Sequence, residues 1–467
     1  MLVESLSGVR GWYGRDLTPN IAQRYAAAYA SSLMKAAKGK RLCIVIGMDT
    51  RPSGPALKDA MLPFLPADII DVGVLPAPAI EHAVRHFRAD GGIIITASHN
   101  EPHDNGLKFL RRTGAILEEQ EMGKLIALAG RMDAARMKVV LSKGAKALGQ
   151  RTVREARKEA IGAYRDFVFF IIGDSAGKIR KEKMTVVLDA NGGAGSMAKH
   201  ILAQAGIRVV ALNSGHGDFA HAVEPTMETL AYLPPLIRKR KAQFGAGFDC
   251  DADRVEIILG NGRMLSGNEL IALAARHMLS TSSRPEKEVV VVNDATSGMV
   301  GEVVRPYGAL LKEVPVGESN VVREMKASGS RVGGEGSSSG IIIAPQTCRD
   351  GILGILMICG IVADRKKSLE ELLGELPRRA YLKRKVSVSK ASMAGLRRSI
   401  IAHYRERGLD VLAEKEGSIK VPMPGSAFAW FRASKTEAGV LRVIVDSPNG
   451  EKAEGLMREA LALAGGA

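Results

Sequence analysis

Three times along this chain of 467 residues, an apolar run ends at an aspartate that is followed by small residues. Each run is followed, after at least a helix-length stretch, by a second loop that is rich in glycine or polar residues. The paired segments are CIVIGMDTRPSG (43–54) with GGIIITASHN (91–100), MTVVLDANGGAG (184–195) with FGAGFDCDADR (244–254), and EVVVVNDATSG (288–298) with VGGEGSSSG (332–340). This internal repeat predicts three α/β units of related topology with largely parallel strands.

The repeated loops follow strand ends, where ligands bind in open α/β sheets. We therefore expect the three loops to line a shared central cleft. From about residue 376 the pattern changes to strand-like runs between two helices, which indicates a smaller C-terminal α+β domain. The predicted domains of this α/β protein are 1–145, 146–263, 264–375 and 376–467.

The charge of the chain, +16 at neutral pH, is concentrated in residues 136–183, with 13 Lys or Arg against 5 acids. A solvated helical face over 151–170 is one interpretation, and steering of a phosphorylated substrate or binding of nucleic acid are two others. There is no apolar run of about 18 residues, no signal-peptide pattern and no paired cysteine motif. A cytoplasmic protein without nucleic-acid or membrane partners is expected.

The first loop places Ser98 just beyond the apolar strand GGIIIT, so that a tight turn presents its hydroxyl. Such a serine can accept a phosphoryl group if cations hold the phosphate, and Lys108 lies ten residues further on. The alternative is a Ser/Asn turn that caps the next helix. A serine hydrolase is disfavoured because the G-x-S-x-G elbow is missing.

The second loop carries Asp249, Asp251 and Asp253 at alternate positions, followed by Arg254. Three carboxylates so close together make an oxygen-rich site suited to Mg²⁺. An EF-hand is disfavoured because Arg254 and Gly260 stand where glycine and glutamate belong. A D-x-D-x-T phosphatase is disfavoured by Asp253, and a solvated acidic turn is the remaining alternative.

The third loop combines Glu335 and Ser337 with four glycines in GGEGSSSG (333–340). The carboxylate and hydroxyl groups can bind sugar hydroxyls, and glycine permits close approach of the backbone. Taken alone, this loop is equally typical of a flexible Gly/Ser turn.

Together these motifs resemble the α-D-phosphohexomutase superfamily from Ser7 to about Met457. TASHNEPHDNGLKF is similar to the phosphoserine loop of that family, and DCDADR is similar to its metal loop. GGEGSSSG followed by Arg349-Asp350-Gly351 resembles the sugar loop and helix start of archaeal-type members, and SGVRG (7–11) and GMDTRPSG resemble two further family elements. The resemblance implies four domains around a central cleft.

The resemblance also implies roles for individual residues. Ser98 would carry the phosphoryl group, and with Asp249, Asp251 and Asp253 it would bind Mg²⁺. Arg10 and Lys108 would flank the transferred phosphoryl group and assist proton transfer. The substrate-binding residues would be Arg254 beside the cleft, Glu335 and Ser337 at the sugar 3- and 4-hydroxyls, and Arg432, Ser434, Lys435 and Thr436 at the non-reacting phosphate.

The implied reaction interconverts hexose 1-phosphate and hexose 6-phosphate through a hexose 1,6-bisphosphate, which also serves as activator. Glucose, mannose and glucosamine phosphates are all candidate substrates, and a non-catalytic sugar-phosphate-binding paralogue is the alternative. The chain departs from the family pattern in several loops: Glu101 and Cys250 in the first two, Ser338 and Ser339 in the sugar loop, and Ala433, Lys435 and Ala438 in the phosphate loop. The segment Gly317–Asn320 also lacks the expected cation, although Arg323 is near.

Overall fold

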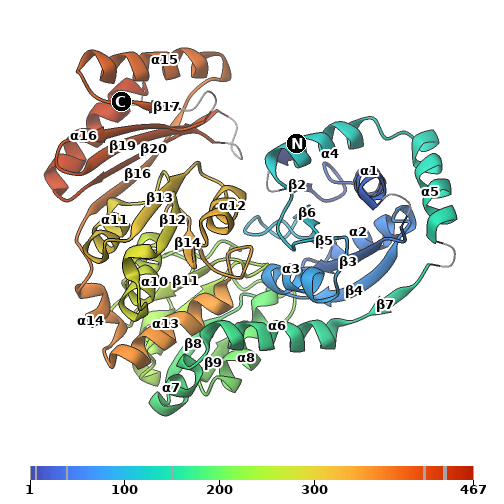
Figure 1. Cartoon of the computed structure of the whole chain (residues 1–467), viewed down its shortest axis with the longest axis horizontal. Helices are drawn as coiled ribbons and strands as arrows, with labels where there is room; N and C mark the ends of the chain where they lie inside the picture. The colour runs from blue at the N-terminus through green and yellow to red at the C-terminus, as the bar shows by residue number, and fades with distance from the viewer. Residues whose placement is uncertain are drawn as a thin grey trace. The chain divides into compact units, whose positions relative to one another are not determined.

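The computed structural model describes residues 2–5, 8–37, 40–148, 151–413, 417–434 and 439–465. The chain divides into two compact units, each of which contains two separate segments (Figure 1). The first unit comprises Met1–Leu265 and Ile342–Glu370, and the second comprises Ser266–Ile341 and Glu371–Ala467. Within the described ranges, no helix is long and apolar enough to cross a membrane.

A seven-stranded sheet forms the N-terminal part of the first unit, with strand order β1-β2-β6-β5-β3-β4-β7. Its strands are β1 (Val3–Ser5), β2 (Gly8–Trp12), β3 (Cys43–Met48), β4 (Asp68–Val74), β5 (Gly91–Ile95), β6 (Asp104–Arg111) and β7 (Val153–Glu155). The helices of this part are α1 (Pro19–Ala37), α2 (Gly54–Met61), α3 (Ala77–His86), α4 (Glu119–Gly130) and α5 (Ala134–Leu148).

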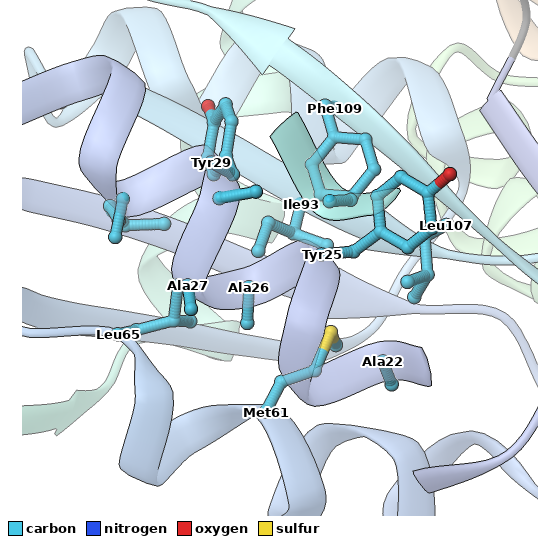
Figure 2. Close-up of a cluster of buried hydrophobic side chains, with 14 of the residues drawn as sticks. Ala22, Tyr25, Ala26, Ala27, Tyr29, Met61, Leu65, Ile93, Leu107 and Phe109 are labelled. Carbon is cyan, nitrogen blue, oxygen red and sulfur yellow. The ribbon is translucent and has the colours of Figure 1, made fainter. Parts of the chain in front are cut away.

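Helix α1 packs an alanine-rich face and two tyrosines into the core of this sheet (Figure 2). The small side chains Ala22 and Ala26 are fully buried. Tyr29 accepts a hydrogen bond from the backbone of Gly92 at 2.9 Å, and a Cβ at Gly91 would lie only 2.0 Å from the tyrosine oxygen. Gly91, the first residue of β5, is therefore required for the close approach of α1.

The helix that we expected to begin near residue 151 begins later. Residues Val153–Glu155 form β7, which pairs in parallel with β4, and helix α6 spans Arg157–Ile172. A strand forms here because its backbone groups pair with those at the edge of β4. A helix at this position would leave the groups at that edge of β4 unpaired.

The second sheet has four strands in the order β11-β10-β8-β9, and the third has the order β13-β12-β14-β15. Their strands are β8 (Thr185–Asp189), β9 (Arg208–Leu212), β10 (Phe244–Phe248), β11 (Val255–Ile258), β12 (Val289–Asn293), β13 (Leu310–Val314), β14 (Val332–Gly334) and β15 (Ile341–Ile343). The accompanying helices are α7 (Ser175–Glu182), α8 (Ala198–Gln204), α9 (Leu233–Arg240), α10 (Gly267–Thr281), α11 (Gly298–Val304), α12 (Glu318–Ser328), α13 (Gly351–Arg365) and α14 (Leu369–Gly374).

The three sheets share one topology. In each, the first strand of the repeat (β3, β8 or β12) pairs in parallel with the next strand along the chain (β4, β9 or β13). On its other side, it pairs in parallel with the strand that precedes the second loop (β5, β10 or β14). One further strand, β6, β11 or β15, follows on that side. The predicted relation between the three α/β units is therefore confirmed.

The fourth sheet is antiparallel and has the order β16-β20-β19-β18-β17. Its elements are β16 (Ala380–Ser387), α15 (Lys390–Glu406), β17 (Leu412–Ala413), β18 (Ile419–Met423), β19 (Ala427–Ala433), β20 (Val440–Ser447) and α16 (Gly450–Leu463). Alternate residues such as Val421, Ala429 and Val443 form its core, with α16 packed against them. The smaller α+β domain is confirmed, whereas the four exact domain boundaries and the central cleft stay predictions.

Candidate functional site

Ser98 lies in the loop after β5, where the backbone turns away from the edge of the sheet. Its φ is +55°, a left-handed conformation that is uncommon for residues other than glycine. The Thr96 hydroxyl accepts the Ser98 amide at 2.9 Å, and the Ser98 hydroxyl donates to Asp249 Oδ2 at 2.9 Å. The predicted phosphoserine loop and the predicted metal loop therefore meet within the first unit.

The second loop follows β10 and buries its three aspartates, which are at most 4% exposed. One carboxylate oxygen from each of Asp249, Asp251 and Asp253 lies within 4.8 Å of the others. Burial, together with the carboxylates of Asp253 and Asp251, raises the pKa of Asp249 well above its ordinary value. So much buried negative charge requires cations nearby.

Three cationic side chains reach this acidic cluster. Lys108, which extends from β6, lies 2.7 Å from Asp251 Oδ2 and 3.4 Å from Asp253 Oδ2. Arg349 contacts Asp253 Oδ2 at 2.9 Å, and Arg254 Nε lies 3.7 Å from a carboxylate oxygen of both Asp249 and Asp253. Burial alone would raise the pKa of Asp253, but these cations lower it below its ordinary value.

Two atoms of the cluster are suited to a metal ion. Asp251 Oδ1 and Asp253 Oδ1 are buried and have no hydrogen-bond partner among the residues that the structure describes. Buried carboxylate oxygens without partners are costly, and hard divalent cations take such oxygens as ligands. The three aspartates can therefore hold a divalent metal.

Arg10 and His99 lie close to the same charges. Arg10 extends from β2, and its buried Nε has no hydrogen-bond partner within the described part of the chain. Burial and the neighbouring Arg254 lower the pKa of Arg10, whereas Asp251 and Asp253 act to raise it. Burial, followed by the charge of Arg254, lowers the pKa of His99 to about 2, so its imidazole is neutral and accepts a hydrogen bond from Arg254 at 2.9 Å.

The predicted sugar loop belongs to the second unit, where neutral donors contact Glu335 and Ser337. Asn293, at the end of β12, donates from Nδ2 to Glu335 Oε1 and to Ser337 Oγ, both at 3.2 Å. The backbone of Gly317 donates to Glu335 Oε1 at 2.9 Å. Thr296 completes the arrangement, because its hydroxyl binds Asn293 Oδ1 at 2.8 Å. The loop that contains the two predicted sugar ligands is thus supported from β12.

The predicted phosphate-binding residues lie partly within the described structure. Arg432 is half-buried near the end of β19, opposite Arg442 on β20, and the Ser434 amide donates to the Val440 carbonyl at 2.7 Å. Lys435 and Thr436 lie outside the described residues, as does Ala438. The structure therefore defines the strand that carries Arg432, and the complete phosphate loop stays a prediction.

Two departures from the family pattern have clear surroundings. Cys250 is buried with its Sγ 3.6 Å from the Thr50 hydroxyl. Glu101 contacts the segment between β9 and α9, where the Val223 amide donates to Glu101 Oε1 at 3.4 Å.

Sequence reasoning missed three residues that contact the predicted site residues. Asn293 could have been found, because it is a polar residue at the end of the apolar run VVVVN. Arg349 was noted as part of a helix start but not as a partner of Asp253. Lys383 on β16 donates to the Ser337 carbonyl at 2.6 Å, and nothing in the strand pattern indicated this contact.

A buried serine beside an aspartate triad and a lysine is an arrangement suited to metal-assisted phosphoryl transfer. Sequence comparison agrees with this class. Profiles of the phosphoglucomutase/phosphomannomutase α/β/α domains I, II and III match residues 4–136, 165–262 and 266–380.

Whole-chain relatives extend the comparison. A phosphoglucomutase/phosphomannomutase of Thermococcus kodakarensis is 33% identical, over 96% of this chain and 94% of its own length. A probable phosphoglucosamine mutase of the same organism is 30% identical, over 97% and 96%. A solved phosphoglucomutase/phosphomannomutase family protein from Burkholderia thailandensis has the same fold, with a TM-score of 0.80, 22% identity and coverage of 100% and 99%. The chain belongs to the phosphoglucomutase/phosphomannomutase family, within the α-D-phosphohexomutase superfamily of isomerases.

Proposed function

We propose that this protein is a phosphohexomutase that carries the phosphoryl group on Ser98. The observation that supports this proposal most directly is the hydrogen bond from the Ser98 hydroxyl to Asp249 within a buried, cation-compensated aspartate triad. Binding a sugar phosphate requires no phosphorylatable serine beside a metal site. The arrangement therefore favours catalysis over the alternative of a non-catalytic paralogue.

The proposed reaction begins with phosphorylated Ser98 and a hexose 1-phosphate. The sugar O6 attacks phosphorus and gives up its proton, while the bond from phosphorus to Ser98 Oγ breaks and Oγ takes up a proton, which gives a hexose 1,6-bisphosphate. After this intermediate has turned round, Ser98 Oγ attacks the phosphoryl group on O1 and gives up its proton, the bond from phosphorus to O1 breaks, and O1 takes up a proton, which restores the phosphoenzyme. The product is a hexose 6-phosphate.

The residues of the first unit would stabilise this transfer by position and charge. Phosphoryl transfer depends mainly on cations at the phosphoryl oxygens. Mg²⁺, bound by Asp249, Asp251 and Asp253 together with the phosphoserine, would supply part of that charge. Arg10, whose buried Nε lacks a partner among the described residues, and Lys108 would flank the group and assist proton transfer, and Arg254 would contact the substrate.

The residues of the second unit would recognise the rest of the substrate. Glu335 and Ser337 would bind the sugar 3- and 4-hydroxyls, which glucose, mannose and glucosamine phosphates share. Arg432 and Ser434, with Lys435 and Thr436, would hold the phosphate that does not react. Since the substrate is used in two orientations, a few hydroxyl ligands and one phosphate clamp suit the reaction better than a rigid pocket.

The test is a coupled assay of the purified protein on glucose, mannose and glucosamine 1-phosphates, with Mg²⁺ and a trace of the matching 1,6-bisphosphate. We expect turnover of at least one substrate, together with added phosphate mass on the peptide that contains Ser98. Binding of these sugar phosphates without turnover or phosphopeptide would instead support the non-catalytic paralogue.

A further inference from the structure

Arg51, in the loop that follows β3, is a fully buried arginine. A buried guanidinium is costly unless its N–H groups are paired, and the side chain has five of them. All five have acceptors: Nε donates to Asp49 Oδ2 at 3.1 Å, Nη1 to the carbonyls of Glu101 (2.6 Å) and Asp104 (3.0 Å), and Nη2 to the carbonyls of Ser98 (2.7 Å) and Asn100.

Four of these acceptors are main-chain carbonyls of a single loop, residues 98–104. Because β3 and β5 are parallel neighbours, the loops that follow them leave the same edge of the sheet. The guanidinium from one loop thus fixes the direction of four peptide planes in the other. One of them is the peptide of Ser98, whose left-handed backbone is unfavourable for a serine and must be held by its surroundings.

A second set of contacts closes a ring around the serine. Asp49 accepts the Arg51 amide at 3.0 Å and the Thr96 hydroxyl at 2.5 Å. The same Thr96 hydroxyl accepts the Ser98 amide at 2.9 Å. The peptide groups on both sides of Ser98 are therefore tied to Arg51, one directly and one through Asp49.

We propose that Arg51 is the positioning residue that holds the loop 98–104 in the conformation that directs the Ser98 hydroxyl toward Asp249. Arg51 contacts the loop and not the reacting atoms. Lysine cannot replace it, because an ammonium donates from a single point and cannot span four carbonyls arranged around a planar fork. The structural role of Arg51 in holding the loop does not depend on any activity, whereas its expected effect on turnover rests on the proposed function.

The experiment compares Arg51→Lys with a matched control, Arg24→Lys, in the full-length protein. Arg24 also donates to two main-chain carbonyls, those of Ala129 and Gly130, but it extends from α1 and its acceptors lie at the end of α4. Hydrogen exchange of the amides in 97–105 reports the loop directly. Steady-state kinetics separate kcat from KM, and single-turnover transfer from phosphorylated Ser98 reports the chemical step.

For Arg51→Lys, we expect faster exchange confined to 97–105 and a kcat lower by about 100-fold, the effect of a misplaced reacting group. KM should change by less than about 3-fold, because the residue makes no contact that distinguishes bound from free substrate. Arg24→Lys should leave both readouts near the wild-type values. Wild-type exchange in 97–105 together with wild-type kcat in Arg51→Lys would overturn the proposal.

Two further outcomes are decisive. If the wild-type protein lacks mutase activity, the proposed function fails, and the exchange comparison still decides whether Arg51 holds the loop. If Arg51→Lys does not fold, Asp49→Asn takes its place, since it weakens the same ring. Faster exchange of 97–105 in Asp49→Asn supports the proposal, and unchanged exchange contradicts it.

Discussion

The acidic loop of the first unit and the sugar loop of the second unit are held in place by different forces. Around Asp253, the contacts are ion pairs with Lys108 and Arg349, all in a buried environment. Around Glu335, the described contacts come from the neutral amide of Asn293 and the backbone of Gly317. The carboxylates of the acidic loop are thus paired directly with cations, whereas neutral donors contact Glu335 and the cation Lys383 contacts the sugar loop through the Ser337 carbonyl.

The largest expected effect comes from Ser98→Ala, which removes the proposed phosphoryl acceptor. Turnover should disappear while the fold is retained, and the added mass of about 80 Da on the peptide around Ser98 should be lost. Ser32→Ala is the matched control, because the Ser32 hydroxyl donates to the Ala28 carbonyl within α1. Near-normal mutase rates in Ser98→Ala would contradict the central assignment.

The next effect tests charge balance in the first unit. Asp251→Asn keeps the shape of the side chain but leaves Lys108 without one of its two carboxylates. We expect weaker metal binding and a rate lower by at least ~100-fold, as for the loss of a principal electrostatic contact. Chelation should abolish activity and Mg²⁺ should restore it. Activity that survives thorough chelation would exclude the metal from the mechanism.

Arg432→Ala tests the only cation that we assign to substrate binding within the described part of the second unit. Loss of a charged hydrogen bond of about 1.5–3 kcal/mol should raise KM by roughly 10-fold to 150-fold. If the arginine also orients the sugar, kcat will fall as well. An unchanged kcat/KM for every accepted sugar phosphate would favour a solvated hairpin. The parallel variant Lys435→Ala tests whether that departure from the family pattern contributes to phosphate binding.

Asn293→Ala tests the neutral scaffold of the sugar loop. It removes the amide that donates to both Glu335 and Ser337, so we expect KM to rise by about 10-fold, in line with one or two buried hydrogen bonds. Because no charge is changed, the effect should vary little between low and high salt. A strong salt dependence of this variant would mean that the two loops do not differ as proposed.

The smallest effect is a pH dependence of stability in the first unit. His221 Nε2 lies 2.7 Å from Asp189 Oδ2, and its Nδ1 lies 2.9 Å from the Ala222 carbonyl. Burial opposes protonation, but these hydrogen bonds raise the pKa of His221 above its ordinary value of 6.5. The stabilisation is therefore complete below pH 6.5 and is lost as the pH rises through the raised pKa.

We expect His221→Gln to lower the Tm by about 1–2 °C at pH 6, with a smaller difference at pH 9. Thermal melts of both proteins across this range provide the measurement. A difference that grows with pH would have the wrong sign and would contradict the role of the protonated imidazole.

Much of the fold could be predicted from the sequence, because an apolar run that ends at an aspartate occurs three times and indicates three units of the same topology. The Ser98 and Asp249 loops were also visible, since adjacent polar residues define each one. The partners from distant parts of the chain were not. Arg349 lies 96 residues from Asp253, and the ion pair depends on the packing of α13, which no local pattern encodes. Likewise, a helix was expected from residue 151, but Val153–Glu155 form a strand because the edge of β4 offers backbone partners.

The division of the first unit into two segments has a practical consequence for expression. A fragment that ends at Leu265 contains Ser98 and all three aspartates, but it lacks Ile342–Glu370. It would therefore lose the Arg349 contact to Asp253 and the helix α13 that packs on α7. Recombinant production of the first unit therefore requires both gene segments, joined by a linker in place of the intervening residues. A simple truncation after Leu265 would expose the apolar face beneath α13.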